Sequence, residues 1–463
     1  MFKVLYFTNT PNNGSLKMLK KLKLKSRLII FLLLLFPCFY ISTENLNDIY
    51  KMALENDPLL KASEATYRAG KEAKSQGISG LLPSLQVTGT TTWNEYRLEE
   101  EKLDEYNSNN YTGSISQPLF RLDKWFQFKQ GKSLSEKAAA TFAYQQQESM
   151  IRIATSYFNV LNAIDSLNAA NAEEKAIGRQ QDLAKKRFDV GLAAITELHE
   201  TQAVFDLSVV ARIAREAEVD YAKESLAAII GGPIPLLAPL SPNFLIVLPN
   251  PLLRDEWVEL GLKNNYQLKA AKFQRDAAKH TARSKGSAHL PNIDIVGRVT
   301  KNTSDQGKFG GFIPNPQVGL EADNRNYSIQ VTVPLFSGGA ISSMRRQAYA
   351  QYDKSKEDVL YTERSTIKEV RSNHFNVQTQ VANVKARKQA LTSANSALEA
   401  TQVGYDIGTR NIVDLLEAQK RLYSSQRDYA GSRYEYIIAM LRLKASVGTL
   451  SPEDIKKISD QMD

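Results

Sequence analysis

The sequence has almost no cysteine. It contains one, Cys38, which follows Phe36 and Pro37 rather than the small residues expected just ahead of a lipidated cysteine. We expect residues 1–42 to be a leader that is cleaved, so the mature chain would contain no cysteine. This excludes disulfides and thiol chemistry, although an exported compartment would permit both.

Long hydrophobic runs are also missing. The most apolar stretch, LIIFLLLLF from Leu28 to Phe36, falls short of the roughly 20 residues that a bilayer requires. Seven Lys and Arg residues precede this run, and Pro37 and polar residues around Ser42 follow it. The pattern predicts a secretory signal peptide over residues 1–42 rather than a permanent N-terminal anchor. An exported chain without a membrane helix is periplasmic, secreted or an outer-membrane β-barrel.

Acidic residues are absent from the leader, which makes the chain look more basic than its mature part. The leader holds seven of the 59 Lys and Arg residues and no Asp or Glu, so 52 basic residues remain against 50 acidic ones. The mature chain is therefore nearly neutral, and we do not expect a nucleic-acid partner.

The sequence also lacks the motifs of enzymes and of metal or cofactor sites. Its histidines are scattered and form no metal-ligand pair: His199, His280, His289 and His374. Gly310-Gly311 and Gly338-Gly339 lack the strand-to-helix setting of a phosphate-binding loop. We expect no catalysis, no cofactor and no metal, and energy for any transport must come from a partner.

What the sequence does contain is a duplication. The segment from Phe188 to Gly231 recurs from Tyr405 to Gly448 at one constant offset. Each copy reads as a glycine turn followed by a long helix with apolar residues at a spacing of seven, interrupted in the first copy by Arg212; this is the spacing of a seam that faces a partner helix. The segments that begin near Leu46 and Trp257 form a second matched pair, so the mature chain is two tandem copies of one unit.

The duplication defines the domains. We assign residues 43–232 to the first repeat and 255–450 to the second, with a proline-rich connector over 233–254 and a short tail over 451–463. No proline interrupts the long stretches after Pro118 and Pro334, which predict antiparallel helix pairs over residues 122–231 and 338–447.

Each repeat also carries segments in which apolar and polar residues alternate. These predict one β-hairpin per repeat, over residues 84–120 and 291–336, with about ten residues per strand, the length a tilted strand needs to cross an outer membrane. The polar stretches 96–110 and 301–326 are read as the loops at the turns. Four strands cannot close a barrel, so the strands must be pooled in an oligomer. A polar inner face favours twelve strands from a trimer over eight from a dimer.

With these motifs in place, the chain resembles the TolC family of outer-membrane efflux ducts. The likeness rests on both Pro-Leu-Phe strand ends, the two-repeat layout and three motifs: YFNVLNAID from Tyr157, RFDVGLAAIT from Arg187 and GYDIGTRNIVDLLEAQ from Gly404. It implies an α+β membrane channel, a homotrimer with a twelve-stranded β-barrel in the outer membrane and a twelve-helix α-barrel in the periplasm. The connector would belong to a belt around the middle. The family also implies a periplasmic adaptor and an inner-membrane pump, driven by protons or ATP, for efflux of small toxic compounds, type I protein secretion, or both.

The resemblance further implies a lock at the periplasmic entrance. Tyr405 and Arg410 match residues that tie the second helix pair to Glu197 of the first, where Glu197 stands in for an aspartate and keeps the charge for a pairing with Arg410. Lys186 occupies a further lock position that is usually glutamine, so its bonds must differ.

Two acidic positions match the ring that lines the family's constriction, namely Asp414 and Glu417. Glu417 replaces an aspartate, and the pair implies a cation-selective throat. The helix tips at Gly191 and Gly408 would receive the adaptor. Plainer interpretations are an exposed i,i+4 ion pair between Arg410 and Asp414, and simple helix-ending roles for the two glycines.

Two rival interpretations remain. A trimeric surface adhesin with a barrel anchor also builds twelve strands from four per chain, but its strands are contiguous at one terminus, whereas here they fall into two hairpins far apart. A soluble periplasmic coiled-coil tether would leave the alternating strands unexplained.

Overall fold

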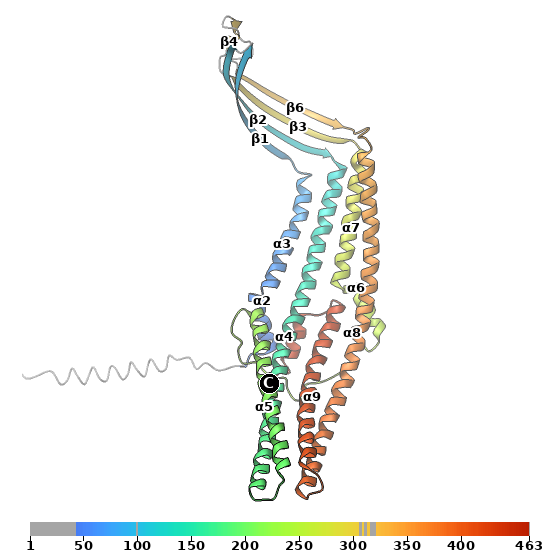
Figure 1. Cartoon of the computed structure of the whole chain (residues 1–463). Helices are drawn as coiled ribbons and strands as arrows, with labels where there is room; N and C mark the ends of the chain where they lie inside the picture. Colours follow the sequence, from blue (N-terminus) through green and yellow to red (C-terminus); the bar gives the residue numbers. More distant parts are fainter. Residues whose placement is uncertain (1–42, 99–100, 305–307, 310–312, 315–320, 463) are drawn as a thin grey trace, which may run out of the picture. The chain divides into compact units, whose positions relative to one another are not determined.

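The computed structural model describes residues 43–98, 101–304, 308–309, 313–314 and 321–462. The chain divides into two compact units, Met1–Glu44 and Asn45–Asp463. All the helices and strands described below belong to the second unit (Figure 1).

The first repeat contains four helices and two strands in the order helix, helix, strand, strand, helix, helix. They are α2 (Leu46–Asn56), α3 (Pro58–Ser79), β1 (Ser84–Leu98), β2 (Glu101–Phe120), α4 (Leu122–Asp189) and α5 (Ile195–Ile230).

The second repeat has the same order, with short additions. Its elements are α6 (Arg254–Asn264), α7 (Tyr266–Gly286), the 3-10 helix η1 (Ser287–His289), β3 (Asn292–Ser304), β4 (Lys308–Phe309), β5 (Ile313–Pro314), β6 (Glu321–Thr332), α8 (Ala340–Asp406) and α9 (Ile412–Ser446). A further helix, α10 (Pro452–Ser459), follows it.

The opening helical segment of each repeat is broken in two by a capping residue. Asp57 accepts a hydrogen bond of 3.1 Å from the backbone N–H of Leu59, and Pro58 begins α3. In the second repeat Asn265 accepts one of 2.9 Å from the N–H of Leu268 and begins α7. A side-chain oxygen that satisfies a free N–H in the first turn starts a new helix at that residue.

The two hairpins form one antiparallel sheet in the order β1-β2-β3-β6 (Figure 1). Ile115 of β2 lies opposite Leu85 of β1 on one side and Gly297 of β3 on the other. This register puts the apolar residues of all four strands on one face, where the side chains of Leu85, Val87, Tyr327 and Ile329 are exposed.

The strands are longer than the alternation of residue types predicts. Residues 96–98 and 101–110, read as part of a polar loop, belong to β1 and β2, and residues 99–100 lie outside the described residues. The predicted loop over 301–326 begins inside β3 and ends inside β6. Polar bonds across the ladder explain the extension: Asn94 donates to Ser108 at 3.0 Å, and Thr91 donates to Asn107 at 3.0 Å. Main-chain pairing requires no apolar face, so an apolar pattern underestimates strand length. Residues 305–307, 310–312 and 315–320 of the predicted loop lie outside the described residues.

β6 ends at Thr332, before the second Pro-Leu-Phe, whereas β2 includes the first. Pro334 has no backbone N–H to donate to a ladder.

The main core lies where the two repeats and the connector meet. Tyr157 and Phe158 of α4 are fully buried, and the ring of Phe158 stacks on Tyr434 of α9 with centroids 5.6 Å apart. The hydroxyl of Tyr157 donates a hydrogen bond of 2.7 Å to the carbonyl of Ala238 in the connector. The YFNVLNAID motif therefore binds the connector to both repeats.

The C-terminal tail also belongs to this core. Ile455 of α10 is 1% exposed, and Asp454 forms an ion pair of 2.6 Å with Lys444 of α9. Ser459 accepts a hydrogen bond of 3.0 Å from the N–H of Asn47 at the start of α2. The tail thus joins the two ends of the second unit, which its polar composition does not suggest.

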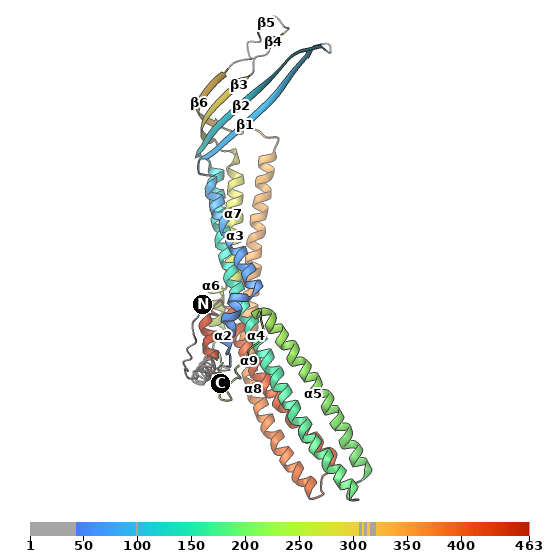
Figure 2. The same cartoon turned by 90° about the vertical axis from the view of Figure 1, so that its left-hand side faces the viewer.

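Within the second unit, α4 packs against α5 and α9, and α8 packs against α9. The tips of the α4/α5 and α8/α9 pairs lie together at the end away from the sheet, as both views show (Figures 1 and 2). Across the described part of the chain, no helix is both long and apolar enough to span a bilayer.

Candidate functional site

The two helix tips are turned by glycines in left-handed conformations. Gly191 has φ 75° and Gly408 has φ 80°, values that other residues adopt only with strain. In the second tip the N–H groups of Thr409 and Arg410 both donate to the carbonyl of Gly404, at 2.8 and 3.1 Å. These bonds fold the turn back onto the end of α8.

Only the second tip has a side-chain cap on its returning helix. Asn411 accepts a hydrogen bond of 2.8 Å from the N–H of Asp414 and so begins α9. Ala194, at the matching place before α5, makes no such bond. The start of α9 is consequently held more firmly than the start of α5.

Tyr405 links the two helix pairs. It lies on the last turn of α8, is 8% exposed, and donates a hydrogen bond of 2.7 Å from its hydroxyl to Oε1 of Glu197 in the first turn of α5. Burial and the neighbouring Glu197 carboxylate raise the pKa of Tyr405 to about 12, so its hydroxyl keeps its proton at physiological pH.

Arg187, on the last turn of α4, is a second partner of Tyr405. Its Nη1 donates to the tyrosine hydroxyl at 3.0 Å, and its guanidinium carbon lies 5.2 Å from the ring centroid. We did not predict this contact. The repeat was the available signal. Arg187 matches Gly404 in the second copy, so Arg187 and the neighbour of Tyr405 occupy equivalent places at the two helix tips.

A small apolar cluster surrounds this contact. Tyr405 packs with Ile177 of α4 and with Ile412, Leu415 and Leu416 of α9. Leu415 is fully buried. The polar bonds of Tyr405 are thus shielded on one side by packed side chains, which strengthens them relative to bonds in open water.

Arg410 makes a different contact from the one the resemblance implies. Arg410 lies in the turn before α9, and within one chain its Nη1 is 3.8 Å from Oδ2 of Asp414 in the first turn of that helix, with both side chains exposed. It does not pair with Glu197, whose carboxylate accepts from Tyr405 instead. The stem of Arg410 lies against Gly404, where an added Cβ would be 2.8 Å from Cγ of Arg410, and its guanidinium lies toward the start of α9.

Lys186 and Glu417 are exposed, and neither side chain has a hydrogen bond or ion pair with another described residue. Asp414 and Glu417 are three residues apart on α9, and side chains at this spacing share one helix face. The first two turns of α9 therefore carry two carboxylates on one face, and of these Asp414 forms an ion pair, with Arg410, within the described residues.

Farther from the tips, one ion pair joins α4 to α9 across the two repeats. Nη1 of Arg427 lies 2.9 Å from Oε2 of Glu173, and the side chains are 23% and 12% exposed. The two helix pairs are therefore tied both at the tips and above them.

This architecture is that of a subunit of an outer-membrane export channel: two repeats, each with a hairpin of strands and a long helix pair, and helix tips linked between the repeats. The chain belongs to the outer membrane efflux protein family, whose model matches residues 49–232 and 257–449. Its place is the outer membrane, and the family is one of channels rather than enzymes.

Named relatives agree with this assignment. Over 90% of its length the chain is 32% identical to the outer membrane protein TolC of Vibrio cholerae, of which it covers 93%. It is 28% identical, over 89% of its length, to the alkaline protease secretion protein AprF of Pseudomonas aeruginosa, of which it covers 86%. The solved structure of CusC matches the fold with a TM-score of 0.75 at 16% identity, over 88% of this chain and 92% of that one. These relatives support an export duct and give no support to the adhesin anchor.

Proposed function

We propose that three copies of this chain form an outer-membrane exit duct that closes at the helix tips. The observation that carries the proposal is the sheet. In the described part of the chain β1 and β6 each have a strand on one side alone, and the apolar residues of all four strands share one exposed face. Open edges beside an apolar face are not tolerated in lipid, so neighbouring copies must pair β1 with β6. Three copies give a twelve-stranded barrel with a lumen, and their long helices give the periplasmic tunnel.

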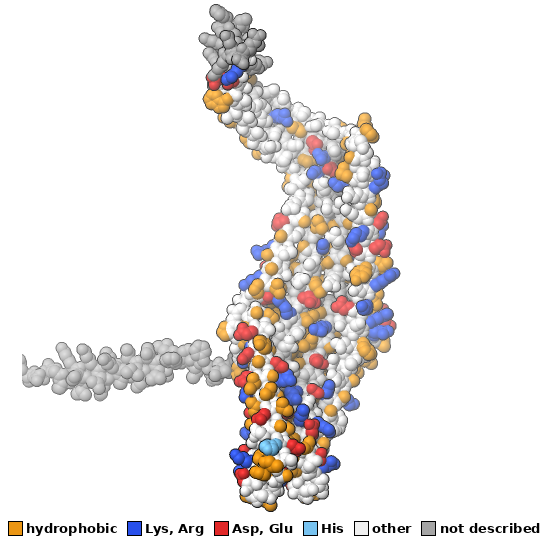
Figure 3. All heavy atoms as spheres, viewed as in Figure 1, with side chains coloured by type: hydrophobic (Ala, Val, Ile, Leu, Met, Phe, Trp, Pro, Cys, Tyr) orange, Lys and Arg blue, Asp and Glu red, His pale blue; other side chains and the backbone are white. Residues whose placement is uncertain are grey.

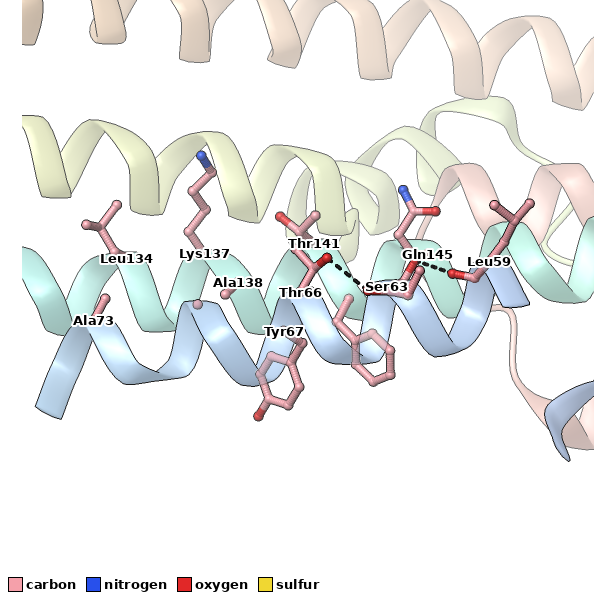
Figure 4. Close-up of a pocket in the computed structure, with 13 residues that line it drawn as sticks. Leu59, Ser63, Thr66, Tyr67, Ala73, Leu134, Lys137, Ala138, Thr141 and Gln145 are labelled. Carbon is pink, nitrogen blue, oxygen red and sulfur yellow. Dashed lines mark hydrogen bonds between the residues drawn. The ribbon is translucent and has the colours of Figure 1, made fainter. Parts of the chain in front are cut away.

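The helices support the same assembly. α3 has no buried residue although it spans 22 positions. Between α3 and α4 lies an apolar groove of about 620 Å³ (Figure 4), lined among others by Leu59, Tyr67, Leu134 and Phe142. The rings of Tyr67 and Phe142 stack there with centroids 5.2 Å apart. We assign this groove to a helix of the next copy.

The outer face of α5 is likewise suited to a neighbour. Leu207, Val210 and Ile213 are 69%, 63% and 53% exposed, and hydrophobic side chains gather along α5 in Figure 3. Their spacing of three residues keeps them on one side of the helix. A second copy that packs here would cover them, which makes a continuous wall of helices.

The lock consists of Tyr405, Glu197, Arg410 and Lys186. Within a protomer, Tyr405 ties α8 to Glu197 of α5. Arg410 and Lys186 are exposed and so available to neighbouring copies around the entrance. Breaking these bonds frees the α8/α9 pair to swing away from the axis, as an iris opens.

The throat behind the lock carries a ring of carboxylates from Asp414 and Glu417. Three copies bring six acidic groups to one constriction, which favours cations over anions. The tips at Gly191 and Gly408 receive a periplasmic adaptor, and an inner-membrane pump supplies the energy. The efflux family supports small toxic compounds as cargo of this chain, and the AprF relative, an alkaline protease secretion protein, supports secreted proteins.

Single-channel conductance tests the gate. Arg410→Ser should raise conductance in planar bilayers because it removes a cation that holds the entrance shut; unchanged conductance would count against the lock. Membrane fractionation with detection of a trimer tests the assembly. A deletion strain that accumulates a fluorescent dye would support the duct, whereas a strain that loses only surface adhesion would favour the adhesin anchor.

A further inference from the structure

We propose that Arg187 is a positioning residue of the gate. In the closed state it holds the hydroxyl of Tyr405 toward Glu197, and when the gate opens its bonding partner changes from Tyr405 to Glu197. The proposal rests on the gate described above and adds to it a residue and a step.

The hydrogen bonds at the tyrosine oxygen are complementary. A tyrosine hydroxyl has one proton to donate and lone pairs that accept. The proton of Tyr405 goes to Glu197 at 2.7 Å, and a lone pair accepts from Nη1 of Arg187 at 3.0 Å. Arginine has donors and no acceptor, so Arg187 can only donate to the tyrosine oxygen, and the tyrosine proton stays directed at the carboxylate.

The positions of the two charges favour this arrangement. Arg187 is in the last turn of α4 and Glu197 is in the first turn of α5. A cation at a helix C-terminus and an anion at an N-terminus are each stabilised by the helix dipole. Both charges belong to the α4/α5 pair, whereas Tyr405 comes from α8. The first helix pair therefore binds the second through two hydrogen bonds to the hydroxyl of Tyr405, one from Arg187 and one to Glu197.

This geometry also provides for the open state. Nη1 of Arg187 and Oε1 of Glu197 are no farther apart than the sum of their distances to the tyrosine oxygen, 3.0 and 2.7 Å. When Tyr405 withdraws with α8, the two charges are left facing each other with no side chain between them, and a small rotation closes an ion pair. Unpaired charges would otherwise oppose opening, because partly buried charged groups without partners are costly. Because an ion pair open to solvent contributes little, the bond from Arg187 to Tyr405 still favours the closed gate on balance.

The backbone of Arg187 has a separate role. Its carbonyl accepts a hydrogen bond of 2.7 Å from the N–H of Leu192 and so closes the α4/α5 turn. A change of side chain leaves that bond in place. The tip should therefore keep its fold when the guanidinium is removed, and the effect on the gate can be measured apart from folding.

The test uses purified full-length trimers in planar bilayers. Arg187→Gln should shift the ratio of closed to open channels toward open by about threefold to tenfold, as expected for a hydrogen bond to a charged group at a partly exposed site. Arg187→Lys, which keeps a donor and the charge, should recover most of the closed state. Lys185→Gln is the matched control, since Lys185 is an exposed cation two positions away on the same turn.

A double-mutant cycle between Arg187 and Tyr405 shows whether Arg187 acts through the tyrosine hydroxyl or stabilises the tip in some other way. Tyr405→Phe keeps the ring and removes the hydroxyl, so Arg187→Gln should add little to it: the double variant should match Tyr405→Phe within about twofold. If the two effects multiply in full, Arg187 acts elsewhere and the proposal is overturned.

The remaining outcomes separate this inference from the gate itself. Wild-type conductance in Arg187→Gln, with raised conductance in Arg410→Ser, would overturn the role of Arg187 and leave the gate intact. Wild-type conductance in Arg187→Gln, Tyr405→Phe and Arg410→Ser together would overturn both. If Arg187→Gln fails to assemble, Arg187→Met, which keeps a long side chain and removes the donor, provides the same coupling against Tyr405→Phe.

Discussion

Tyr434 of α9 donates a hydrogen bond of 2.6 Å to Oδ2 of Asp165 on α4, beside the stacked rings of Tyr434 and Phe158. The two residues come from different repeats and bring a half-buried carboxylate into the edge of the aromatic core. Burial raises the pKa of Asp165, and the bond from Tyr434 and the charge of Arg433 offset part of that rise. The carboxylate is thus held by its partners against an unfavourable environment.

The pH dependence of this site has a definite sign. A carboxyl whose pKa is raised in the folded protein adds stability below its unfolded pKa of about 3.9, and this contribution is lost as pH rises through the folded value. Asp165→Asn carries no charge and can still accept from Tyr434. We expect the variant to gain stability relative to wild type between pH 4 and pH 7.5, by on the order of 1 kcal/mol.

Thermal unfolding of the purified trimer at the two pH values measures this difference. Tyr434→Phe is the companion variant, because it leaves the carboxylate without its donor and should lower stability at pH 7.5 by about 1 to 3 kcal/mol. An Asp165→Asn curve that runs parallel to wild type at every pH would show that Asp165 does not titrate in this range.

The second prediction concerns ion selectivity at the entrance. Neutralising Glu417 and Asp414 together, as Glu417→Gln and Asp414→Asn, should shift the reversal potential in a salt gradient toward zero, because the ring that favours cations is gone. Asp414→Asn alone also releases Arg410 and so mixes selectivity with gating. Glu417→Gln alone is the cleaner variant, and Glu200→Gln, an exposed acid on α5, is its control. A reversal potential unchanged in the double variant would place the constriction elsewhere.

The sequence predicts much of this architecture because the relevant signals are local. The proline-free stretches place the helix pairs, the alternating residues place four strands, and the glycines at 191 and 408 mark the turns. Each of these follows from backbone chemistry that one segment carries by itself.

Contacts made by long side chains are not predictable in the same way. Glu197 and Arg410 both match lock positions, yet within one chain Glu197 accepts from Tyr405, whereas Arg410 packs over Gly404 and lies beside Asp414 of α9. Arg187 of the first repeat contacts Tyr405 of the second, and no local sequence pattern predicts a contact between residues so far apart in the chain. The polar ends of the strands are missed for a related reason, since main-chain pairing leaves no mark in residue type.

The third prediction concerns α10. Ile455 is 1% exposed within the main core, and we expect Ile455→Ala to lower the free energy of unfolding by about 2 to 5 kcal/mol, the usual cost of a buried isoleucine. Lys457→Ala, on the exposed side of the same helix, should change it by less than about 0.5 kcal/mol. Chemical denaturation of both variants measures the difference. If the two variants were equally stable, the tail would be dispensable, and α2 and α9 would stabilise the main core without it.

The last prediction reverses an ordinary rule. An alanine in a helix interior is usually more stable than a glycine by about 0.5 to 1 kcal/mol. Gly131 of α4 is buried against α3, and a Cβ at this position would lie 2.2 Å from the carbonyl oxygen of Ala73, which is backbone and cannot move aside cheaply. Gly131→Ala should therefore push α3 away from α4 and destabilise the protein. It should also weaken the trimer, because α3 lines the groove assigned to the neighbouring copy (Figure 4).

Gly286→Ala is the matched control for this change. Gly286 ends α7, and the nearest atom to an added Cβ there is Cδ of Arg345 at 4.0 Å, a flexible side chain. This variant should be neutral or slightly more stable. Thermal unfolding gives the sign of the stability change in both variants. The trimer fraction in detergent, measured by light scattering, shows whether Gly131→Ala also weakens the trimer. If Gly131→Ala were as stable as Gly286→Ala but lost the trimer, the close contact would act on assembly alone. If it kept both, α3 would have room to shift, and the groove would not require a fixed distance between α3 and α4.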